Sequence, residues 1–295
     1  MHFADELITR VRELGNPLCV GIDPYLDRIP ERFGARGSAE AVEAFGCAIV
    51  DRVAGRVPVV KPQIAFFEQL GWQGMRALDA VVRRARAAGL LVLLDAKRGD
   101  IGSTADGYAA AYLAADAPIE VDAITLNPYL GLDTLEPFAK AAAENGRGLF
   151  VLSKTSNPGS GDLQDLEVEG TPVYERVAAS LAPLCKRLAG PETGWSSLGV
   201  VVGATWPGQH EAVRKHLPNA VLLVPGYGAQ GGGAADAVRG FVPGPNGMEG
   251  GIVNSSRGVL YPDGAEGGDG KSWERAIDGA LDRAIDELSA ATRAA

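Results

Sequence analysis

Cysteine and histidine are both scarce in this chain of 295 residues, which has three of each. The cysteines show neither Cys-x-x-Cys nor metal-ligand spacing, and a sparse, odd number of them is typical of a reducing compartment, so we expect a cytoplasmic location. His2 lies near the start of the chain, while His210 and His216 fall in a predicted helix. We therefore expect the histidines on the surface, and the sequence offers no cluster of metal ligands.

Long apolar runs and an excess of positive charge are also absent. No stretch of 18 apolar residues occurs, so no membrane span is expected, and the charged, helical start does not resemble a secretory signal. The net charge of −9 argues against a general binder of nucleic acid or anionic membranes. It does not exclude a local cationic pocket for a phosphorylated metabolite.

Lysine is rare as well, with seven lysines against 21 arginines. Two of the seven, Lys61 and Lys97, stand at the ends of apolar runs. Arginine stays charged in proteins, whereas a lysine can change its pKa and donate a proton. A high ratio of arginine to lysine can also reflect the base composition of the genome. These two lysines therefore indicate a functional site only together with the residues around them.

Short apolar runs alternate with amphipathic helical stretches along the whole chain. Continuous apolar runs joined by helices indicate parallel strands that are buried on both faces. Eight such units favour a (β/α)8 barrel, an α/β fold, over a doubly wound sheet, and no linker divides residues 1–295 into more than one domain. The predicted strands are 18–22, 57–61, 90–95, 123–126, 149–153, 198–202, 221–224 and 251–253.

Two stretches rich in glycine, serine and acidic residues interrupt this alternation. Residues 155–171 and 190–197 are too long for tight turns, so we expect both to form long loops or lids on the active face. Residues 240–251 read as a loop before the last strand. A final helix is expected over residues 272–291.

The stretch of residues 91–106 contains the most informative motif, Asp-x-Lys-x-x-Asp. An apolar run ends in Asp95, Lys97 and Asp100. Charged side chains are costly to bury unless they pair with opposite charges or serve in a functional site. In a strand, Asp95 and Lys97 share a face, and barrels place their chemistry at the C-terminal ends of their strands. A solvated strand end with a surface salt bridge remains the alternative for this motif alone.

Polar residues at the other strand ends strengthen the functional interpretation. Nearly every predicted strand delivers a polar or charged group to the same rim. The glycine-rich loop of residues 225–232 and Arg257 follow the last two strands, where barrels commonly bind phosphate through backbone N–H groups. The other rim residues include Asp23, Lys61, Asn127 and the run of residues 154–159.

The order and spacing of these motifs resemble orotidine 5′-phosphate decarboxylases, in the longer bacterial branch (type 2), from Asp23 to Arg257. The residues that carry the resemblance are Lys61, the run of residues 95–101, Pro225-Gly226 with Gln230, and Arg257. The resemblance implies decarboxylation of orotidine 5′-phosphate to UMP without metal or cofactor. Lys61 separates the chain from sugar-phosphate decarboxylases on the same barrel, which carry a metal-binding acidic residue at that position.

The resemblance also implies a role for each matching residue. Lys61, Asp95, Lys97 and Asp100 would form an alternating charge array in which Lys97 donates the proton. Asp100, Ile101 and Thr104 would act across a homodimer interface. Asp23 would hold a ribose hydroxyl, Asn127 would contact substrate, Ser156 would bind the pyrimidine, and Gln230 and Arg257 would hold the phosphate. Ser153 and Thr155 remain alternatives to Ser156.

Two other functions stay open at this stage. A sugar-phosphate decarboxylase or aldol-type synthase would need Mg²⁺ and an acidic residue in place of Lys61. A catalytically silent barrel that binds a phosphorylated metabolite would have no use for four buried charges. We expect no nucleic-acid partner and no membrane partner.

Overall fold

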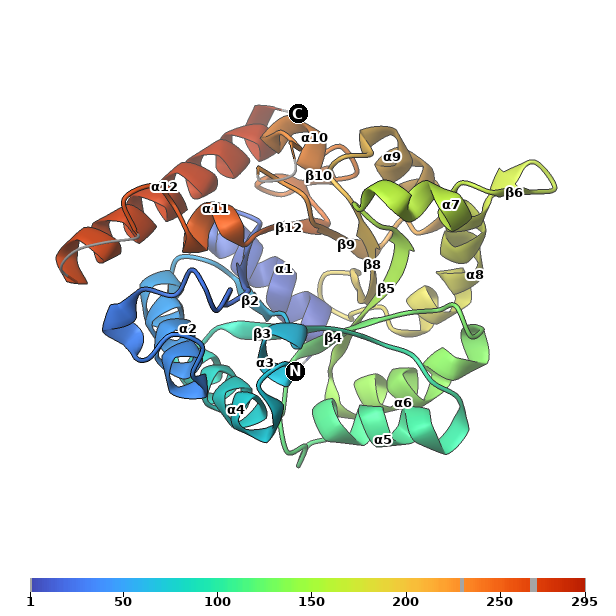
Figure 1. Ribbon diagram of the computed structural model, residues 1–295. Coiled ribbons are helices and arrows are strands. Elements are labelled where there is room, and N and C mark those ends of the chain that lie inside the picture. Colours follow the sequence, from blue (N-terminus) through green and yellow to red (C-terminus); the bar gives the residue numbers. More distant parts are fainter. Residues whose placement is uncertain (1, 229–230, 266–269, 295) are drawn as a thin grey trace.

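Eight parallel strands close into a barrel in this protein, which a computed structural model describes for residues 2–228, 231–265 and 270–294 (Figure 1). The strands follow one another around the ring in chain order, and β12 pairs with β1 to close it. The predicted (β/α)8 barrel is confirmed, and each of the eight predicted strands overlaps an observed one. The strands are β1 (Leu18–Ile22), β2 (Val59–Pro62), β3 (Leu91–Arg98), β4 (Ala123–Leu126), β5 (Gly148–Lys154), β8 (Ser196–Val202), β9 (Ala220–Val224) and β12 (Gly251–Ser255).

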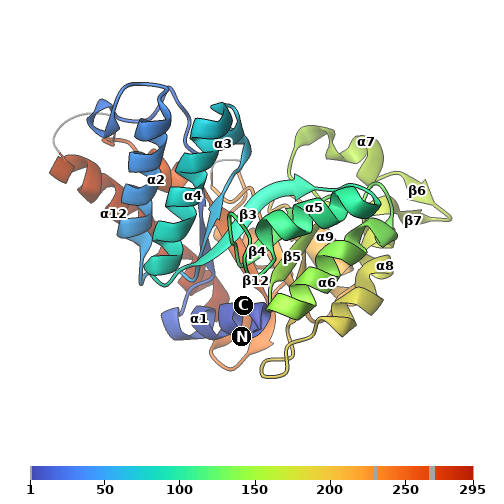
Figure 2. The same cartoon turned by 90° about the horizontal axis from the view of Figure 1, so that it is seen from below.

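Helices connect the strands and cover the outside of the barrel (Figures 1 and 2). Helices that are neighbours in the chain pack side by side, as α2 does with α4 and α5 with α6. Within the described ranges, no helix has the length and apolar character needed to cross a bilayer. The main helices are α2 (Ala39–Val53), α4 (Gly71–Ala87), α5 (Gly102–Tyr112), α6 (Glu136–Asn145), α8 (Val173–Arg187), α9 (Pro207–His216), α10 (Ala234–Ala237) and α12 (Gly270–Ala294).

Short elements decorate the connections between these helices and strands. After barrel strands lie η1 (Glu31–Phe33), α3 (Ala65–Glu68), η2 (Leu132–Leu135), η3 (Pro158–Ser160), α7 (Gly161–Gln164), β6 (Glu167–Val168), β7 (Thr171–Pro172) and α11 (Arg257–Leu260). The antiparallel pair of β10 (Val242–Gly244) and β11 (Gly247–Glu249) precedes the last barrel strand.

The strands alternate between the barrel interior and the helix layer. Interior side chains form one buried cluster that includes Cys19, Val59, Leu93 and Phe150, while the residues between them pack outward against the helices. This alternation brings Lys61 and Asp95, each two residues beyond an interior apolar residue, to the same side of the barrel wall.

Helix α1 (Phe3–Leu14) covers the N-terminal end of the barrel (Figure 2). Phe3, Leu7 and Ile8 are buried in the same cluster as the interior strand residues. The ring of Phe3 meets the ring of Phe150 edge to face, with 6.0 Å between centroids. Apolar packing therefore closes this end, and the polar side chains gather at the opposite end.

The two predicted lids lie at opposite ends of the barrel. Residues 155–171 follow β5 and stand at the C-terminal end, as expected, where they form η3, α7 and β6. The prediction for residues 190–197 is wrong, because this segment leads from α8 into the first two residues of β8 and so lies at the N-terminal ends of the strands. There Thr193 donates hydrogen bonds from its N–H (2.7 Å) and its hydroxyl (2.6 Å) to Asp5 of α1.

The expectation that all three histidines lie on the surface is also wrong. His210 of α9 is fully buried, and its Nε2 lies 2.9 Å from the carbonyl oxygen of Gly203. Burial lowers the pKa of His210, so it packs as a neutral side chain. The helical pattern of residues 208–216 indicated a helix correctly but did not show which face of it was covered.

Candidate active site

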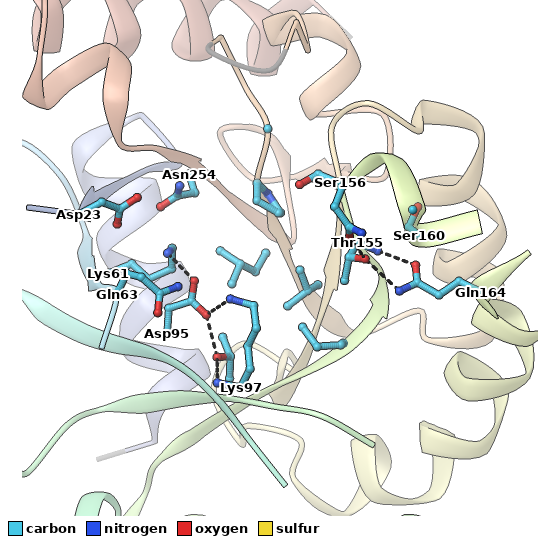
Figure 3. Close-up of a pocket in the computed structure, with 18 of the residues that line it drawn as sticks. Asp23, Lys61, Gln63, Asp95, Lys97, Thr155, Ser156, Ser160, Gln164 and Asn254 are labelled. Carbon is cyan, nitrogen blue, oxygen red and sulfur yellow. Dashed lines mark hydrogen bonds and ion pairs between the residues drawn. The ribbon is translucent and has the colours of Figure 1, made fainter. Parts of the chain in front are cut away.

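A cavity of about 580 Å³ opens at the C-terminal end of the barrel (Figure 3). Its volume falls in the range of small-molecule sites. Charged and polar side chains from β1, β2, β3 and β12 face residues of the segment after β5 across the cavity. The polar lining residues are Asp23, Lys61, Gln63, Asp95, Lys97, Thr125, Thr155, Ser156, Asn157, Ser160, Gln164 and Asn254.

Asp95 forms the centre of the charged wall. Its Oδ2 accepts a hydrogen bond from Lys61 Nζ at 2.8 Å, and its Oδ1 accepts one from Lys97 Nζ at 2.6 Å. Thr125 donates its hydroxyl to the same Oδ1 at 2.9 Å. One carboxylate therefore bridges two ammonium groups, as the shared strand face of Asp95 and Lys97 predicts.

The backbone of β3 changes course at this point. Lys97 has a φ of 47°, in the left-handed region that is uncommon for residues other than glycine, and the register with β4 shifts between Leu94 and Arg98. The Thr125 hydroxyl accepts hydrogen bonds from the N–H groups of Ala96 (3.0 Å) and Lys97 (2.8 Å). Thr125 thus uses its one donor and two acceptor positions to hold both the carboxylate and the turned backbone.

The two lysines differ in their exposure. The side chain of Lys61 is 5% exposed, whereas that of Lys97 is 46% exposed and reaches the open cavity. Burial alone would lower the pKa of Lys61, but Asp95 and Asp23 outweigh it and raise that pKa above its usual value. Lys61 is therefore held as a fixed positive charge.

Asp95 itself stays ionised. Burial would raise the pKa of its carboxyl, but the two lysines more than compensate and hold that pKa well below its usual range. Near neutral pH this carboxylate is already deprotonated and has no proton to donate. The group in the array that can donate a proton to a ligand in the cavity is Lys97.

Asp23 lies beside this array on the end of β1. Burial raises the pKa of its carboxyl, while Lys61 opposes the change and Ser256 contributes a hydrogen bond. Its Oδ1 is buried and has no hydrogen-bond partner among the described residues. Tyr261 donates its hydroxyl to the Asp23 carbonyl at 2.9 Å, which fixes the turn that carries this carboxylate.

A buried thiol lies beneath the charges. Cys19 of β1 points into the barrel interior, and its Sγ is 3.8 Å from Asn254 Oδ1. Burial raises the pKa of this thiol to about 12, so it remains protonated. Cys19 packs in the barrel interior, level with Val59 and two residues below Lys61, as a small neutral side chain.

The opposite wall separates the three candidate hydroxyls after β5. Ser153 donates its hydroxyl to the Tyr174 carbonyl and is absent from the lining. The Thr155 hydroxyl bonds Asn157 at 2.6 Å and accepts from Gln164 at 2.9 Å. Ser156 lines the cavity and points toward the charged wall (Figure 3). Among the three, the position of Ser156 best fits contact with a ligand.

The structure brings together five of the predicted site residues, and the others lie elsewhere. Asp23, Lys61, Asp95, Lys97 and Ser156 line the cavity. Asp100, Ile101 and Thr104 lie on the surface at the start of α5, and Asn127 is exposed, with its Oδ1 accepting the Tyr129 N–H at 3.0 Å. Arg257 is exposed at the start of α11, directly after β12, and Gln230 falls outside the described residues.

Sequence reasoning missed Thr125 and Gln63 as lining residues, whereas Asn254 follows from its place at the end of the last predicted strand. Period-two alternation could have found both, because Gln63 stands two residues after Lys61 and Thr125 two residues after the interior residue Ala123. Asn254 stands two residues after the interior residue Ile252. Within the described ranges, no group of three or more His, Cys, Asp or Glu side chains has a metal-binding arrangement.

A parallel barrel with a charged cavity at its C-terminal end is the arrangement of a TIM-barrel enzyme. A family model described as "Orotidine 5'-phosphate decarboxylase / HUMPS family" matches residues 16–266, and the chain belongs to this family. It is 44% identical over 303 residues to the orotidine 5′-phosphate decarboxylase of Rhodopirellula baltica, covering 98% of this chain and 99% of that protein.

Two further relatives cover nearly the same length. The orotidine 5′-phosphate decarboxylase of Roseiflexus castenholzii is 41% identical, with 100% of each chain covered. The solved structure of Leishmania donovani OMP decarboxylase has a TM-score of 0.76 and 32% identity, with 99% of each chain covered. The similarity thus extends over the whole barrel and is not confined to one motif.

The bonding of Thr125 predicts a measurable loss of stability. Thr125→Val keeps the side-chain shape but leaves Asp95 Oδ1 and two backbone N–H groups without this partner. We expect the free energy of unfolding at pH 7 to fall by about 1–3 kcal/mol, measured by urea denaturation. Thr125→Ser keeps the hydroxyl and should lose much less. Equal losses in the two variants would contradict the assigned role of the hydroxyl.

Proposed function

We propose that this protein decarboxylates orotidine 5′-phosphate to UMP without a metal or cofactor, the last step of de novo pyrimidine nucleotide synthesis. Asp95 bridging one buried and one open lysine is the observation that carries this proposal. A cation fixed beside an open proton donor suits a reaction that builds negative charge on carbon and then quenches it. Family membership supports the same substrate.

The array accounts for both halves of the reaction. Loss of CO₂ from C6 of the pyrimidine leaves the bonding electron pair on C6 as a carbanion. The Lys97 ammonium stabilises this charge and then donates a proton to C6, and the neutral amine recovers its proton from water. Lys61 and Asp95 keep Lys97 in place through the 2.6 Å contact.

The charge balance makes such a site tolerable inside the barrel. Two carboxylates, Asp23 and Asp95, neutralise Lys61 and Lys97 within one chain. Buried charges remain stable only when partners and hydrogen bonds compensate their desolvation. Asp100 supplies a further negative charge if it enters from a second chain.

Substrate recognition is distributed around the rim. The glycine-rich loop follows β9, where Gly226 lines the cavity and the Gly232 N–H closes a turn on the Gly226 carbonyl at 3.3 Å. We assign phosphate binding to this loop with Gln230 and Arg257, because backbone N–H groups and a guanidinium suit an anion. Asp23 would accept a ribose hydroxyl at its buried Oδ1, and Ser156 would contact the pyrimidine.

An exposed apolar patch supports a homodimer with shared sites. Ile101, just before α5, is 62% exposed, the connection after β4 carries three more exposed apolar residues, and α5 contacts η2 of that connection. Asn127 donates its N–H to the Arg98 carbonyl at 2.8 Å, which holds the two connections together. We propose that a second copy covers this patch and receives Asp100 and Thr104. The other patch residues are Tyr129, Leu130 and Leu132.

The proposed reaction should proceed without a metal. We expect purified protein to deplete orotidine 5′-phosphate, followed by its ultraviolet absorbance, at the same rate with and without EDTA. The family also includes HUMPS proteins, and a metal-dependent aldol or sugar-phosphate reaction would behave differently. Activity that disappears on chelation and returns only with Mg²⁺ would refute the proposed mechanism.

Lys97→Ala should nearly abolish turnover while leaving nucleotide binding intact. We expect kcat to fall by about 10²–10⁴-fold, because the proton donor is removed. The dissociation constant of UMP, measured by calorimetry, should change little, since the proposed phosphate and ribose contacts lie elsewhere. Lys140→Ala, on the exposed face of α6, is the matched control. A loss of less than tenfold would exclude Lys97 as the donor.

Arg257→Ala should weaken the binding of UMP far more than the binding of uridine. Loss of a charged hydrogen-bond partner costs about 1.5–3 kcal/mol, or roughly 10–150-fold in affinity. Titration calorimetry with both ligands measures the difference. Arg239→Ala serves as the control, because that side chain is 58% exposed and pairs with Glu211. Equal weakening for both ligands would place the phosphate elsewhere.

Shared sites predict complementation between two inactive variants. Lys97→Ala and Asp100→Ala, mixed by co-refolding, place both defects in one pocket of a mixed dimer and leave the other pocket intact. Random mixing makes about half of the dimers mixed, so about a quarter of the wild-type activity should return. Mixed dimers that form, as native mass spectrometry would show, yet stay inactive would place Asp100 in the site of its own chain.

A further inference from the structure

Lys154, the last residue of β5, forms an ion pair that lies outside the charge array, with a buried lysine side chain and a partner, Asp165, whose side chain is 44% exposed. The Lys154 side chain has no solvent exposure, and its Nζ donates to both carboxylate oxygens of Asp165, at 2.7 and 2.8 Å. The ammonium also lies 4.9 Å from the centroid of the Trp206 ring. Asp165 directly follows α7, so the pair joins the end of a barrel strand to the end of the segment beside the cavity.

A register shift explains why Lys154 is not in the cavity itself. Phe150 and Leu152 belong to the barrel interior, so regular alternation would turn Lys154 inward as well. The pairing with β8 shifts between Leu152 and Lys154, and Lys154 then pairs with Val202. Val202 packs in the outer cluster, and Lys154 accordingly points away from the cavity and under α7.

A second pair of residues ties the same two points of the chain together. The Thr155 N–H donates to Gln164 Oε1 at 2.9 Å, and Gln164 Nε2 donates to the Thr155 hydroxyl at 2.9 Å (Figure 3). Lys154 and Thr155 at the start of the loop are therefore fastened to Gln164 and Asp165 at its end.

The fastened loop forms one wall of the cavity. It contributes Ser156, Asn157, Gly159, Ser160 and Leu163 to the lining. On the outer side, Trp206 donates its indole N–H to the Thr155 carbonyl at 3.2 Å, and Gly203 donates its N–H to the Lys154 carbonyl at 2.9 Å. These two contacts tie the start of the loop to the connection between β8 and α9.

We propose that Lys154 is a positioning residue that acts through Asp165 to preform the wall that receives the pyrimidine. It touches no substrate, and its ammonium holds the loop closed so that Ser156 faces the charged wall before the nucleotide arrives. The proposal rests on the proposed function for the identity of the ligand. The fastening of the loop does not depend on that function, because it is argued only from the Lys154–Asp165 and Thr155–Gln164 contacts.

Lys154→Met and Asp165→Asn test this role. Both should raise KM for orotidine 5′-phosphate by about tenfold or more, with kcat changed much less. Without the ion pair the loop is no longer held in place, so part of the substrate's binding free energy is used to order it. Asp165→Glu retains the carboxylate and should restore KM to near the wild-type value. Lys186→Met, on an exposed position of α8, is the matched control.

Hydrogen exchange of the peptide covering residues 155–165 gives a readout that does not need turnover. Faster exchange in Lys154→Met and Asp165→Asn, but not in Lys186→Met, is expected if the pair fastens the loop. Thermal unfolding shows whether each variant folds, and Lys154→Met replaces the ammonium by an apolar chain of similar length, which buried sites tolerate.

The outcomes separate the two proposals. Wild-type protein without decarboxylase activity would refute the proposed function, and UMP affinity with hydrogen exchange would then decide the role of Lys154. Unchanged exchange in both variants would overturn the fastening. If exchange is faster but KM and UMP affinity are unchanged, the fastened loop does not position the ligand. That result would also overturn the proposal.

Discussion

The bridging of two lysines by Asp95 is the interaction on which the site depends. A lone carboxylate or ammonium at this depth would be too costly to desolvate, and two lysines at this spacing would repel each other. With Asp95 between them, one lysine becomes a fixed charge and the other an open donor. The position of Asp95 in turn depends on Thr125 and on the left-handed backbone at Lys97.

The barrel supplies the conditions that this bridge requires. Helix α1 and the interior apolar residues exclude water from the N-terminal end, so the charges can be solvated only from the cavity side. Strand alternation brings Lys61 and Asp95 from neighbouring strands to the same end of the barrel interior without any special loop. The loop after β5 is the less regular half of the site, and its shape rests on contacts formed far from the alternation that orders the strands.

The sequence predicted the parts of the structure that follow from periodicity. Apolar runs located all eight strands, and the two-residue period placed Asp95 and Lys97 on one face. The sequence could not show the register shifts in β3 and β5. A bulge changes the face to which a residue points, and no residue type signals it in the sequence. The two hydrogen bonds that the Thr125 hydroxyl accepts could not be predicted, because they depend on that turned backbone.

Two other predictions failed for a related reason. Residues 190–197 were assigned to the active face from composition, but whether a loop precedes or follows a strand decides its end of the barrel. His210 was expected on the surface because the helical pattern around it is polar, yet that face of α9 packs inward over the Gly203 carbonyl. Asp100, Ile101, Thr104 and Asn127 stay predictions, since their proposed contacts need a second chain or a ligand.

Cys19 has a chemical consequence for the whole site. A thiolate below Lys61 would add a negative charge to the array and a nucleophile to the floor, but burial keeps this sulfur protonated, with a pKa of about 12. Electrophiles that modify cysteine, and mild oxidants, therefore find no reactive sulfur under the cavity. A covalent probe for this site is better directed at the Lys97 side chain, which is 46% exposed in the cavity, than at Cys19.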